Sequence, residues 1–296
     1  MTEQIGFIGL GIMGKPMALN LLKAGYPLHV YARRAEQTQP LLAEGATAHD
    51  SAQAVATHSD VVILMVSDTP DVEEVILGAQ GVLAGARAGS VVVDMSTIAP
   101  ANTRALAKRL AEQDVAMLDA PVSGGEAGAI AGTLSIMVGG EAAVFARLKP
   151  VFEVLGKNIV HVGGNGAGQV TKMCNQMVVA QTIAAVGEAL LLAERCGVGP
   201  AKVRAALLGG FASSRVLEAH GQRMLEDNFT PGFRARLHQK DLRIALESAR
   251  DVGVTVPGTA AAAQLLGTLV ERGDGDLDHA AMITVLREMA DKPGDQ

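Results

Sequence analysis

A lysine stands near the start of the most apolar stretch of the chain. Lys172 lies in the segment Gln169 to Arg195, and Asn175 and Gln176 follow it at the spacing of one helical face. A lysine is rarely buried without a partner, and burial lowers the pKa of an amine toward values useful for acid–base work. These residues predict a general acid and base at Lys172, with Asn175 orienting the substrate or the lysine. The alternative is a lysine whose ammonium group reaches solvent at the helix start.

A second chemical feature is a run of glycines close to the N-terminus. The pattern GxGxxG spans Gly9, Leu10, Gly11, Ile12, Met13 and Gly14. It follows an apolar run and opens a helical one, which is the context in which it binds the pyrophosphate of a dinucleotide. Gly9 permits a tight turn, Gly11 lets the backbone approach the phosphates, and Gly14 lets helix and strand pack closely. The helix N-terminus adds free N–H groups, so all six positions are predicted to bind the cofactor. A glycine-rich turn that binds nothing is the alternative.

Two arginines after the next apolar run bear on the choice of cofactor. An acidic residue near this point favours NAD by binding the ribose 2′-hydroxyl, but none occurs before Glu36. Arg33 and Arg34 can instead pair with the 2′-phosphate of NADP through their planar guanidinium groups. The pattern therefore favours NADP and leaves NAD open, with two solvated surface arginines as the alternative.

Further candidates follow predicted strands, where open α/β sheets bind their ligands. Met65 and Val66 close one strand and are expected to pack on the cofactor, or else to fill the core. Thr97 follows another strand and is expected near the nicotinamide ribose. In Ser123-Gly124-Gly125, successive backbone N–H groups can form an anion-binding nest for a substrate carboxylate, with the serine adding a hydroxyl. An ordinary turn is the alternative.

The hydrophobic pattern of the first half indicates the elements that position these groups. Short β-branched runs alternate with helical stretches, and their continuity fits strands buried on both faces of a parallel sheet. This alternation indicates βαβ units in a doubly wound, Rossmann-type α/β sheet. The expected strands are Ile5–Ile8, Leu28–Tyr31, Val61–Val66, Val91–Asp94, Val115–Leu118, Thr133–Val138 and Ile159–Val162. The expected helices are Met13–Ala24, Ala35–Glu44, Ser51–Ala56, Val72–Leu77, Pro100–Glu112 and Ala142–Leu155.

The second half has a different character. Beyond Gly163–Gly166 the β-branched runs nearly vanish, and Ala, Leu, Glu and Arg dominate. Gln169 to Arg195 predicts one long helix, apolar on almost every side, that ends before Gly197 and must be buried by other helices. Those helices are expected at Pro200–Leu208, Val216–Glu226, His238–Val252, Thr259–Arg272 and Ala280–Ala290. We therefore expect a dinucleotide-binding domain over residues 1–164 and an all-α substrate and oligomerisation domain over residues 165–296.

Composition excludes several classes of protein. The chain has 296 residues, a net charge of −6, 49% hydrophobic residues and 3% aromatic residues. These values argue against a disordered chain and against a nucleic-acid binder with a basic, aromatic surface. Two cysteines are too few for a disulfide framework, and seven histidines show no ligand spacing, so we expect no metal. The sequence shows neither a signal peptide nor a membrane span, and we expect a cytoplasmic protein with no membrane partner.

Three separated motifs together resemble the β-hydroxyacid dehydrogenase family. They are Gly6–Met17, Asp119–Gly125 and Gly166–Gln176, and the match runs from the first strand into the last helices. The resemblance implies an NAD(P)-dependent oxidoreductase for a small substrate, and a homodimer or homotetramer joined through the α-domain. It also places Lys240 against the cofactor and the substrate, whereas a surface ion pair with the adjacent aspartate is the alternative. Asp119 is expected to form hydrogen bonds at a strand end rather than to act as an acid.

Segments of the second half resemble one branch of that family. Gly209–Arg215, Leu237–Leu242 and Val162–Gly166 resemble enzymes that reduce tartronate semialdehyde (2-hydroxy-3-oxopropanoate) reversibly to D-glycerate. In that reaction Lys172 would protonate the oxygen on which charge develops as hydride reaches the carbonyl carbon. The alternatives are a 3-hydroxyisobutyrate dehydrogenase or another short-chain 3-hydroxyacid dehydrogenase, an imine reductase, and a non-catalytic cofactor-binding module. The last two usually lack the lysine. Ala32 stands where some members carry an acid, which leaves the cofactor preference open.

Overall fold

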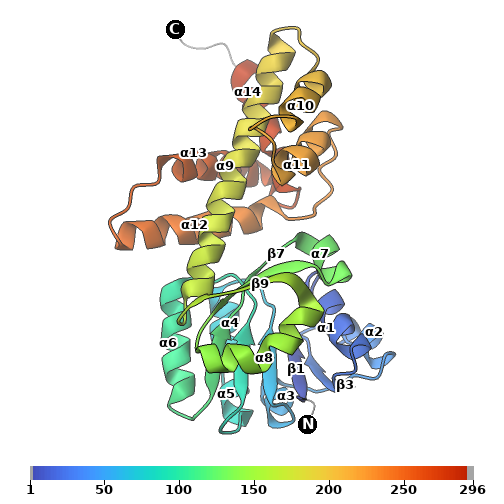
Figure 1. The fold of residues 1–296 in the computed structure, drawn as a ribbon, viewed down its shortest axis with the longest axis vertical. Helices are drawn as coiled ribbons and strands as arrows, with labels where there is room; N and C mark the ends of the chain where they lie inside the picture. Colours follow the sequence, from blue (N-terminus) through green and yellow to red (C-terminus); the bar gives the residue numbers. More distant parts are fainter. Residues whose placement is uncertain (1–2, 292–296) are drawn as a thin grey trace. The chain divides into compact units, whose positions relative to one another are not determined.

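Each continuous apolar run of the first half forms a strand, and the strands build one sheet. The structure is a computed structural model that describes residues 3–291. Its strands are β1 (Ile5–Ile8), β2 (Leu28–Tyr31), β3 (Thr47–Ala48), β4 (Val61–Leu64), β5 (Val91–Asp94), β6 (Ala116–Asp119), β7 (Val122–Ser123), β8 (Leu134–Gly139) and β9 (Gly156–Gly163). They lie in the order β3-β2-β1-β4-β5-β6-β8-β7, with β9 paired to β8 (Figure 1). β1 through β6 pair in parallel, whereas β8 is antiparallel to β6 and β7.

The register of the parallel strands lines up their carboxyl ends. Ile8 pairs with Leu64, Leu64 with Asp94, and Asp94 with Asp119. The loops after β1, β4, β5 and β6 therefore leave the sheet at one edge, which is where open α/β sheets bind ligands. These loops carry most of the site residues that the sequence predicts in the first half.

Helices cover both faces of the sheet, which explains why its central strands β1, β4 and β5 are buried at every position. The helices of this unit are α1 (Gly14–Lys23), η1 (Ala35–Gln37), α2 (Gln39–Leu42), α3 (Ala52–Thr57), α4 (Thr69–Leu77), α5 (Val82–Gly85), α6 (Pro100–Ala111), α7 (Gly125–Ala131) and α8 (Ala142–Leu155). Within β4, Val61 and Ile63 join one buried cluster, which includes α1 and α8. Val62 and Leu64 join the other, which includes α3, α4 and α6. The predicted Rossmann-type fold is confirmed.

Several details differ from the prediction where the local signal is weak. The helix expected at Ala35–Glu44 is two short pieces, η1 and α2, because Pro40 lies in the first turn of α2 and is compatible only with a new helix start. β3 and β7 have two residues each, too few for periodicity to mark. α7 contains Gly125 and Gly128 and was predicted only as a turn, since glycine disfavours helix. The sheet was expected to be parallel, but β8 runs antiparallel to its neighbours β6 and β7.

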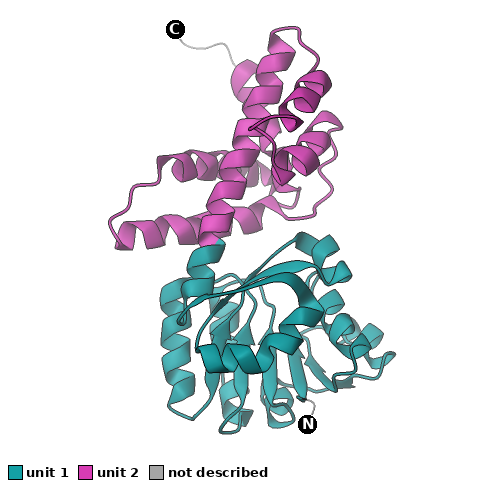
Figure 2. Ribbon diagram, in the orientation of Figure 1, with its two compact units in different colours: residues 1–172 teal, residues 173–296 magenta. Residues whose placement is uncertain are grey.

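The second half is an assembly of helices around α9. The helices are α9 (Ala167–Arg195), α10 (Pro200–Leu208), α11 (Arg215–Leu225), α12 (Ala235–Asp251), α13 (Pro257–Leu269), η2 (Val270–Asp274), η3 (His279–Ala281) and α14 (Met282–Asp291). Gly197 follows α9 with a φ of +73°, the left-handed cap that the sequence predicts. The chain divides into compact units inside α9, between Lys172 and Met173 (Figure 2), and not at residue 164. The reason is that the first turn of α9 is hydrogen-bonded to the sheet through Asp119.

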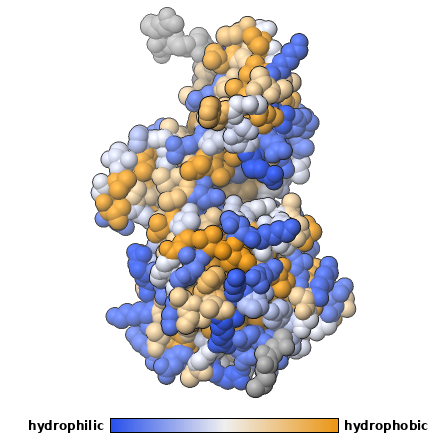
Figure 3. All heavy atoms as spheres, viewed as in Figure 1, coloured by the Kyte–Doolittle hydropathy of each residue, from blue (hydrophilic) through white to orange (hydrophobic). Residues whose placement is uncertain are grey.

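Residues 3–291 leave one side of α9 uncovered. Val170, Val178 and Leu192 are 43%, 65% and 65% exposed, so the helices of a single copy cover α9 only in part. By length and composition α9 could also cross a membrane, a test that core helices of water-soluble proteins pass as well. Figure 3 shows further apolar surface on the helical unit, including the tip between α12 and α13, where Val252 and Val254 are exposed.

Candidate functional site

The glycine loop between β1 and α1 has the geometry that its sequence predicts. Gly9 has a φ of +97°, and a Cβ there would overlap the main-chain oxygen of Met65. A Cβ at Gly14 would overlap the main-chain oxygen of Gly9 and lie 3.0 Å from the ring of Phe7. No atom of the described residues lies within 4 Å of a Cβ built at Gly11. Gly9 and Gly14 are therefore required by the fold, while Gly11 keeps a space open outside it.

That open space fits the diphosphate of a dinucleotide. α1 begins beside it, no described side chain caps its N-terminus, and its first turn holds no acidic residue. The partial positive charge of the helix N-terminus therefore lies beside Gly11, while the N–H of Lys15 donates to the main-chain oxygen of Gly11 at 3.0 Å and Pro16 has no N–H. Ile12 is 55% exposed on the loop, whereas the side chain of Leu10 is buried in the core and can offer a ligand only its backbone.

Hydrogen bonds tie the loops after β4 and β5 together. The N–H of Val66 donates to Ser96 Oγ at 3.0 Å, and the N–H of Ser96 donates to Asp94 Oδ1 at 2.9 Å. Thr97 follows directly and is half-buried. Met65 and Val66 pack against the two buried clusters of the sheet. Both side chains are only partly buried, and their packing on the cofactor stays a prediction.

Gln169 and Asp119 fix the start of α9 against this edge. Gln169 is fully buried; its Oε1 accepts from the N–H of Ile98 at 3.2 Å, and its Nε2 donates to the main-chain oxygen of Ser96 at 2.8 Å. Asp119, also fully buried, accepts from the N–H groups of Gly166 at 2.8 Å and Gln169 at 3.0 Å. Burial raises the pKa of Asp119 above its ordinary value although these N–H groups act to lower it. Its predicted hydrogen-bonding role is therefore confirmed, whereas the sequence did not single out Gln169.

Lys172 lies one helical turn beyond Gln169. Residues three apart share a helix face, so Lys172 faces the same side as the glutamine that holds the loop containing Thr97. Lys172 is only 7% exposed, which does not fit the alternative of an ammonium group directed into solvent. Within the N-terminal unit, the buried amine of Lys172 therefore lies on the same face of α9 as Gln169, and Gln169 binds the loop at the ligand-binding edge of the sheet.

The segment after β7 turns at two successive glycines. Gly124 and Gly125 have φ values of +139° and +61°, and Gly125 begins α7. No described side chain caps Gly124, and the first turn of α7 holds one acidic residue, Glu126. Ser123 is half-buried and pairs with Ser135 of β8. The predicted turn is present, and binding of a carboxylate there stays a prediction.

In the helical unit, a string of polar side chains joins Asn175 to Lys240. Asn175 Nδ2 donates to Gln176 Oε1 at 2.8 Å, and Gln176 Nε2 donates to Asp241 Oδ2 at 2.6 Å. Lys240 Nζ lies 3.1 Å from Asp241 Oδ1, and the two side chains are 13% and 3% exposed. The ion pair with the adjacent aspartate is present but mostly buried rather than on the surface, and contact of Lys240 with the cofactor and substrate stays a prediction. Gln176 and Asp241 join the candidate site as residues whose roles the sequence did not reveal.

Arg33 and Arg34 follow β2 on the surface. Arg33 Nη1 lies 3.2 Å from Asp71 Oδ1, and Arg34 Nε lies 4.0 Å from Glu36 Oε1. Their side chains are 77% and 71% exposed, so both guanidinium groups are accessible to a ligand.

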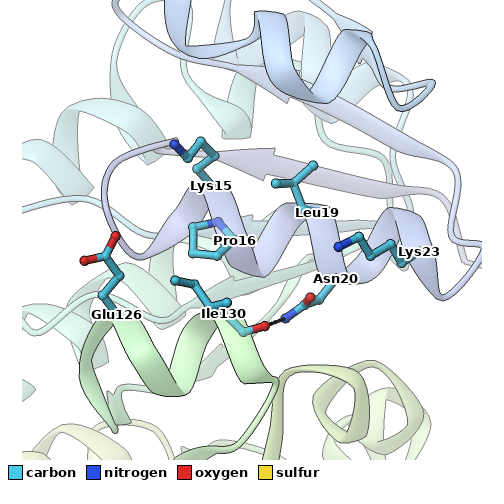
Figure 4. Close-up of a pocket in the computed structure, with 7 residues that line it drawn as sticks. All are labelled: Lys15, Pro16, Leu19, Asn20, Lys23, Glu126 and Ile130. Carbon is cyan, nitrogen blue, oxygen red and sulfur yellow. Dashed lines mark hydrogen bonds between the residues drawn. The ribbon is translucent and has the colours of Figure 1, made fainter.

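A shallow pocket of about 200 Å³ lies between α1 and α7 (Figure 4). It is lined by Lys15, Pro16, Leu19, Asn20, Lys23, Glu126 and Ile130, and Asn20 Nδ2 donates to the main-chain oxygen of Ala129 at 2.8 Å. None of the predicted site residues lines this pocket. It is a feature of helix packing and not part of the candidate site.

The fold also gathers residues that no spacing rule connects. Potential ligand atoms of His220, Asp278 and His279 lie within 4.8 Å of one another, although the residues come from α11 and from the segment that leads into η3. The sequence offered no signal for this cluster, because His220 lies far along the chain from the adjacent pair Asp278 and His279. Absence of a metal stays a prediction.

Comparison with known proteins places this geometry in a family. Residues 4–163 match the family described as NAD binding domain of 6-phosphogluconate dehydrogenase, and residues 166–286 match NAD-binding of NADP-dependent 3-hydroxyisobutyrate dehydrogenase. The 2-hydroxy-3-oxopropionate reductase of Escherichia coli strain K12 is 51% identical over 97% of this chain and 98% of its own. The 3-hydroxyisobutyrate dehydrogenase of Pseudomonas aeruginosa is 38% identical over 95% of this chain and 96% of its own. The structure of Mycobacterium tuberculosis 3-hydroxyisobutyrate dehydrogenase with L-serine matches with a TM-score of 0.90 and 33% identity, over 97% of this chain and 100% of that one. The chain belongs to the β-hydroxyacid dehydrogenase family and is an oxidoreductase that acts on CH–OH groups with a nicotinamide cofactor.

Proposed function

We propose that the enzyme reduces tartronate semialdehyde reversibly to D-glycerate, with Lys172 as the general acid. The observation that carries the proposal is the buried amine of Lys172, one turn from the glutamine that binds the Ser96–Ile98 loop. The substrate assignment is supported by the reductase of Escherichia coli, which is 51% identical over nearly the whole of both chains.

The chain's own residues have separate tasks in this reaction. Hydride for the carbonyl carbon comes from the bound nicotinamide cofactor. Lys172 donates a proton to the carbonyl oxygen as negative charge develops there, and it accepts that proton in the reverse direction. The N–H groups around Gly124 and Gly125, with the hydroxyl of Ser123, bind the substrate carboxylate. Asn175 orients the reacting groups by hydrogen bonds.

Replacing Lys172 by alanine tests the mechanism. The variant should lose at least about 100-fold in kcat, because general acid catalysis contributes roughly 10²–10⁴-fold. Binding of the reduced cofactor, followed by its fluorescence, should persist because the glycine loop is unchanged. Lys149→Ala is the matched control, since Lys149 lies on the surface of α8 in an exposed pair with Glu153. Near-normal turnover of the Lys172 variant would refute the mechanism.

We propose NADP as the preferred cofactor, with Arg33 and Arg34 binding its 2′-phosphate. Support comes from their exposed guanidinium groups and from the lack of an acid at Ala32. The structure of Psf3 in complex with NADP⁺ and 2-OPP is a neighbour, with a TM-score of 0.86 at 26% identity. A charge-assisted hydrogen bond contributes about 1.5–3 kcal/mol, so each arginine-to-alanine change should raise KM for NADPH about 10- to 100-fold. KM for NADH should change little; an equal effect on both cofactors would refute the assignment.

A 3-hydroxyisobutyrate dehydrogenase is the second candidate. It is favoured by the family match over residues 166–286 and by the solved structure with a TM-score of 0.90. Side-by-side kcat/KM values for tartronate semialdehyde and methylmalonate semialdehyde decide between the two. We also propose that the exposed side of α9 joins copies of the chain into a homodimer or homotetramer, because it leaves Val178 and Leu192 uncovered.

A further inference from the structure

Three histidines of the helical unit form one hydrogen-bonded chain behind Gln176. His238 of α12 approaches the main-chain oxygen of Gln176 through Nε2 at 3.1 Å. His238 Nδ1 lies 2.8 Å from His279 Nδ1, and His279 Nε2 lies 3.2 Å from His220 Nε2 of α11. His238 is fully buried and His279 is 5% exposed, so this chain runs through the interior of the unit.

For neutral rings, the carbonyl at one end determines the proton positions on His238 and His279. A carbonyl oxygen only accepts, so His238 Nε2 must donate to Gln176. A neutral imidazole carries one N–H, so His238 Nδ1 accepts, and His279 Nδ1 donates to it. By the same rule His279 Nε2 accepts from His220 Nε2. Burial and the neighbouring His238 lower the pKa of His279 well below its ordinary value, which agrees with a neutral ring.

Asp278 lies beside the far end of the chain. Its carboxylate lies 3.5 Å from His220 Nδ1 and accepts hydrogen bonds from three backbone N–H groups, those of Gly232 at 2.8 Å, Phe233 at 3.1 Å and Ala280 at 3.1 Å. Arg223 Nη1 lies 3.7 Å from the same carboxylate. These hydrogen bonds fix the position of the Asp278 carboxylate beside the two histidines.

We propose that His238, held in one tautomer by His279, is a positioning residue that sets the geometry of Asn175 and Lys240. The inference rests on the proposed function, which uses Asn175 and places Lys240 at the site. His238 lies two residues before Lys240 on α12, and its Nε2 binds the helical turn that carries Asn175. The bond therefore fixes α12 against α9 at the point where Gln176 also binds Asp241. Loss of that one donor should move Asn175 and Lys240 relative to each other, and a misplacement of about 1 Å can reduce turnover about 100-fold.

Asparagine and glutamine substitutions test the two rings separately. Glutamine places its amide near the Nε2 position and asparagine near the Nδ1 position. His238→Gln should therefore keep the donor to Gln176 and most of the kcat, whereas His238→Asn should lose about 10- to 100-fold in kcat. At His279 the order should reverse, because Nδ1 is the atom that binds His238. Loss of packing alone would not make glutamine the better substitute at His238 and asparagine the better one at His279. If kcat of the four variants simply followed their thermal stability, the proposal would be overturned.

A control and a measurement without substrate complete the experiment. His161→Asn removes a similar bond, from His161 Nε2 to the main-chain oxygen of Gly140 at 2.8 Å, in the other unit, and should leave kcat unchanged. NMR of the ¹⁵N-histidine-labelled wild type should show an Nε2–H tautomer for His238 and an Nδ1–H tautomer for His279. Other tautomers would overturn the inference whatever the substrate proves to be. If NMR shows the predicted tautomers but His238→Asn keeps full activity, the positioning role is overturned and the proposed function stays intact.

Discussion

Replacing Asp119 by alanine should destabilise the start of α9 and slow catalysis. The carboxylate accepts from two backbone N–H groups, those of Gly166 and Gln169, at 2.8 and 3.0 Å. Alanine leaves both donors without this acceptor at a buried position. Because Lys172 lies on the next turn of the same helix, a disordered first turn would also misplace the amine.

The expected magnitude is a balance of two effects. A buried donor without an acceptor costs about 1–3 kcal/mol, so two cost roughly 2–6 kcal/mol. Burial opposes this, because it raises the pKa of Asp119 above the value in the unfolded chain. The folded protein therefore holds the proton to higher pH, and ionisation of Asp119 lowers stability as pH rises through that window. Removing the buried charge recovers part of the loss, which leaves a net destabilisation of about 2–4 kcal/mol, or roughly 4–16 °C in Tm.

Thermal melts of three variants at neutral pH measure this balance. Asp119→Ala should melt lowest, and Asp119→Asn should lie between it and the wild type, since the amide keeps one acceptor oxygen but turns an NH₂ group toward the other donor. Glu112→Gln is the control: Glu112 is an exposed carboxylate at the end of α6, and its loss should change stability by less than about 0.5 kcal/mol. A higher Tm for Asp119→Asn than for the wild type would refute the reasoning, because burial of the charge would then outweigh its hydrogen bonds.

Three further predictions follow from the same structure. Gly14→Ala should lower Tm and abolish cofactor binding because its Cβ would overlap a neighbouring backbone oxygen, whereas Gly11→Ala should leave Tm unchanged and weaken cofactor binding about 10-fold or more in a fluorescence titration. Glutamate at both Val178 and Leu192 should convert the oligomer into monomers in sedimentation velocity, and a monomeric wild type at micromolar concentration would contradict the proposed assembly. Burial acts to raise the pKa of Asp278, but two neighbouring histidines and the backbone N–H groups that donate to it lower the pKa below its ordinary value. The ionised carboxylate therefore stabilises the folded state above about pH 4, and the difference in urea stability between wild type and Asp278→Asn should shrink as pH falls below that value.

The fold was predictable where one hydrophobic pattern extended over a whole helix or strand. In Val61–Leu64, alternate residues enter two different buried clusters, so a continuous apolar run is what a strand between two layers of helices requires. α7 shows the opposite case. Gly125 and Gly128 disfavour a helix locally, yet the helix forms because Ala129 is buried in the core of the sheet's first face. Tertiary packing of this kind overrides propensity and leaves no mark on a local pattern.

The candidate site was predictable where its chemistry is local. Gly9 and Gly14 have roles that depend on atoms within a few residues or on the neighbouring strand, and the spacing alone indicates them. Gln169 is different, because its partners Ser96 and Ile98 lie far away in sequence. In the sequence, Gln169 is recognisable only as a polar side chain in an apolar helix, and that observation does not predict which residues it binds.

The polar side chains among the apolar residues of α9 explain how the helix positions the candidate site. Among apolar neighbours the helix carries Gln169, Lys172, Asn175 and Gln176, spaced three, three and one residues apart on one side. Within the N-terminal unit, Gln169 is bound at both ends of its amide to one loop; within the helical unit, Gln176 binds Asp241. The two glutamines thus hold the helix in place, and Lys172 and Asn175, which lie between them, are the residues with proposed roles in the reaction. Because one continuous helix carries Lys172 and Asn175, their separation along its axis is held at about 4.5 Å by a rise of roughly 1.5 Å per residue. Movement of either glutamine should therefore act on the lysine and the asparagine as a pair.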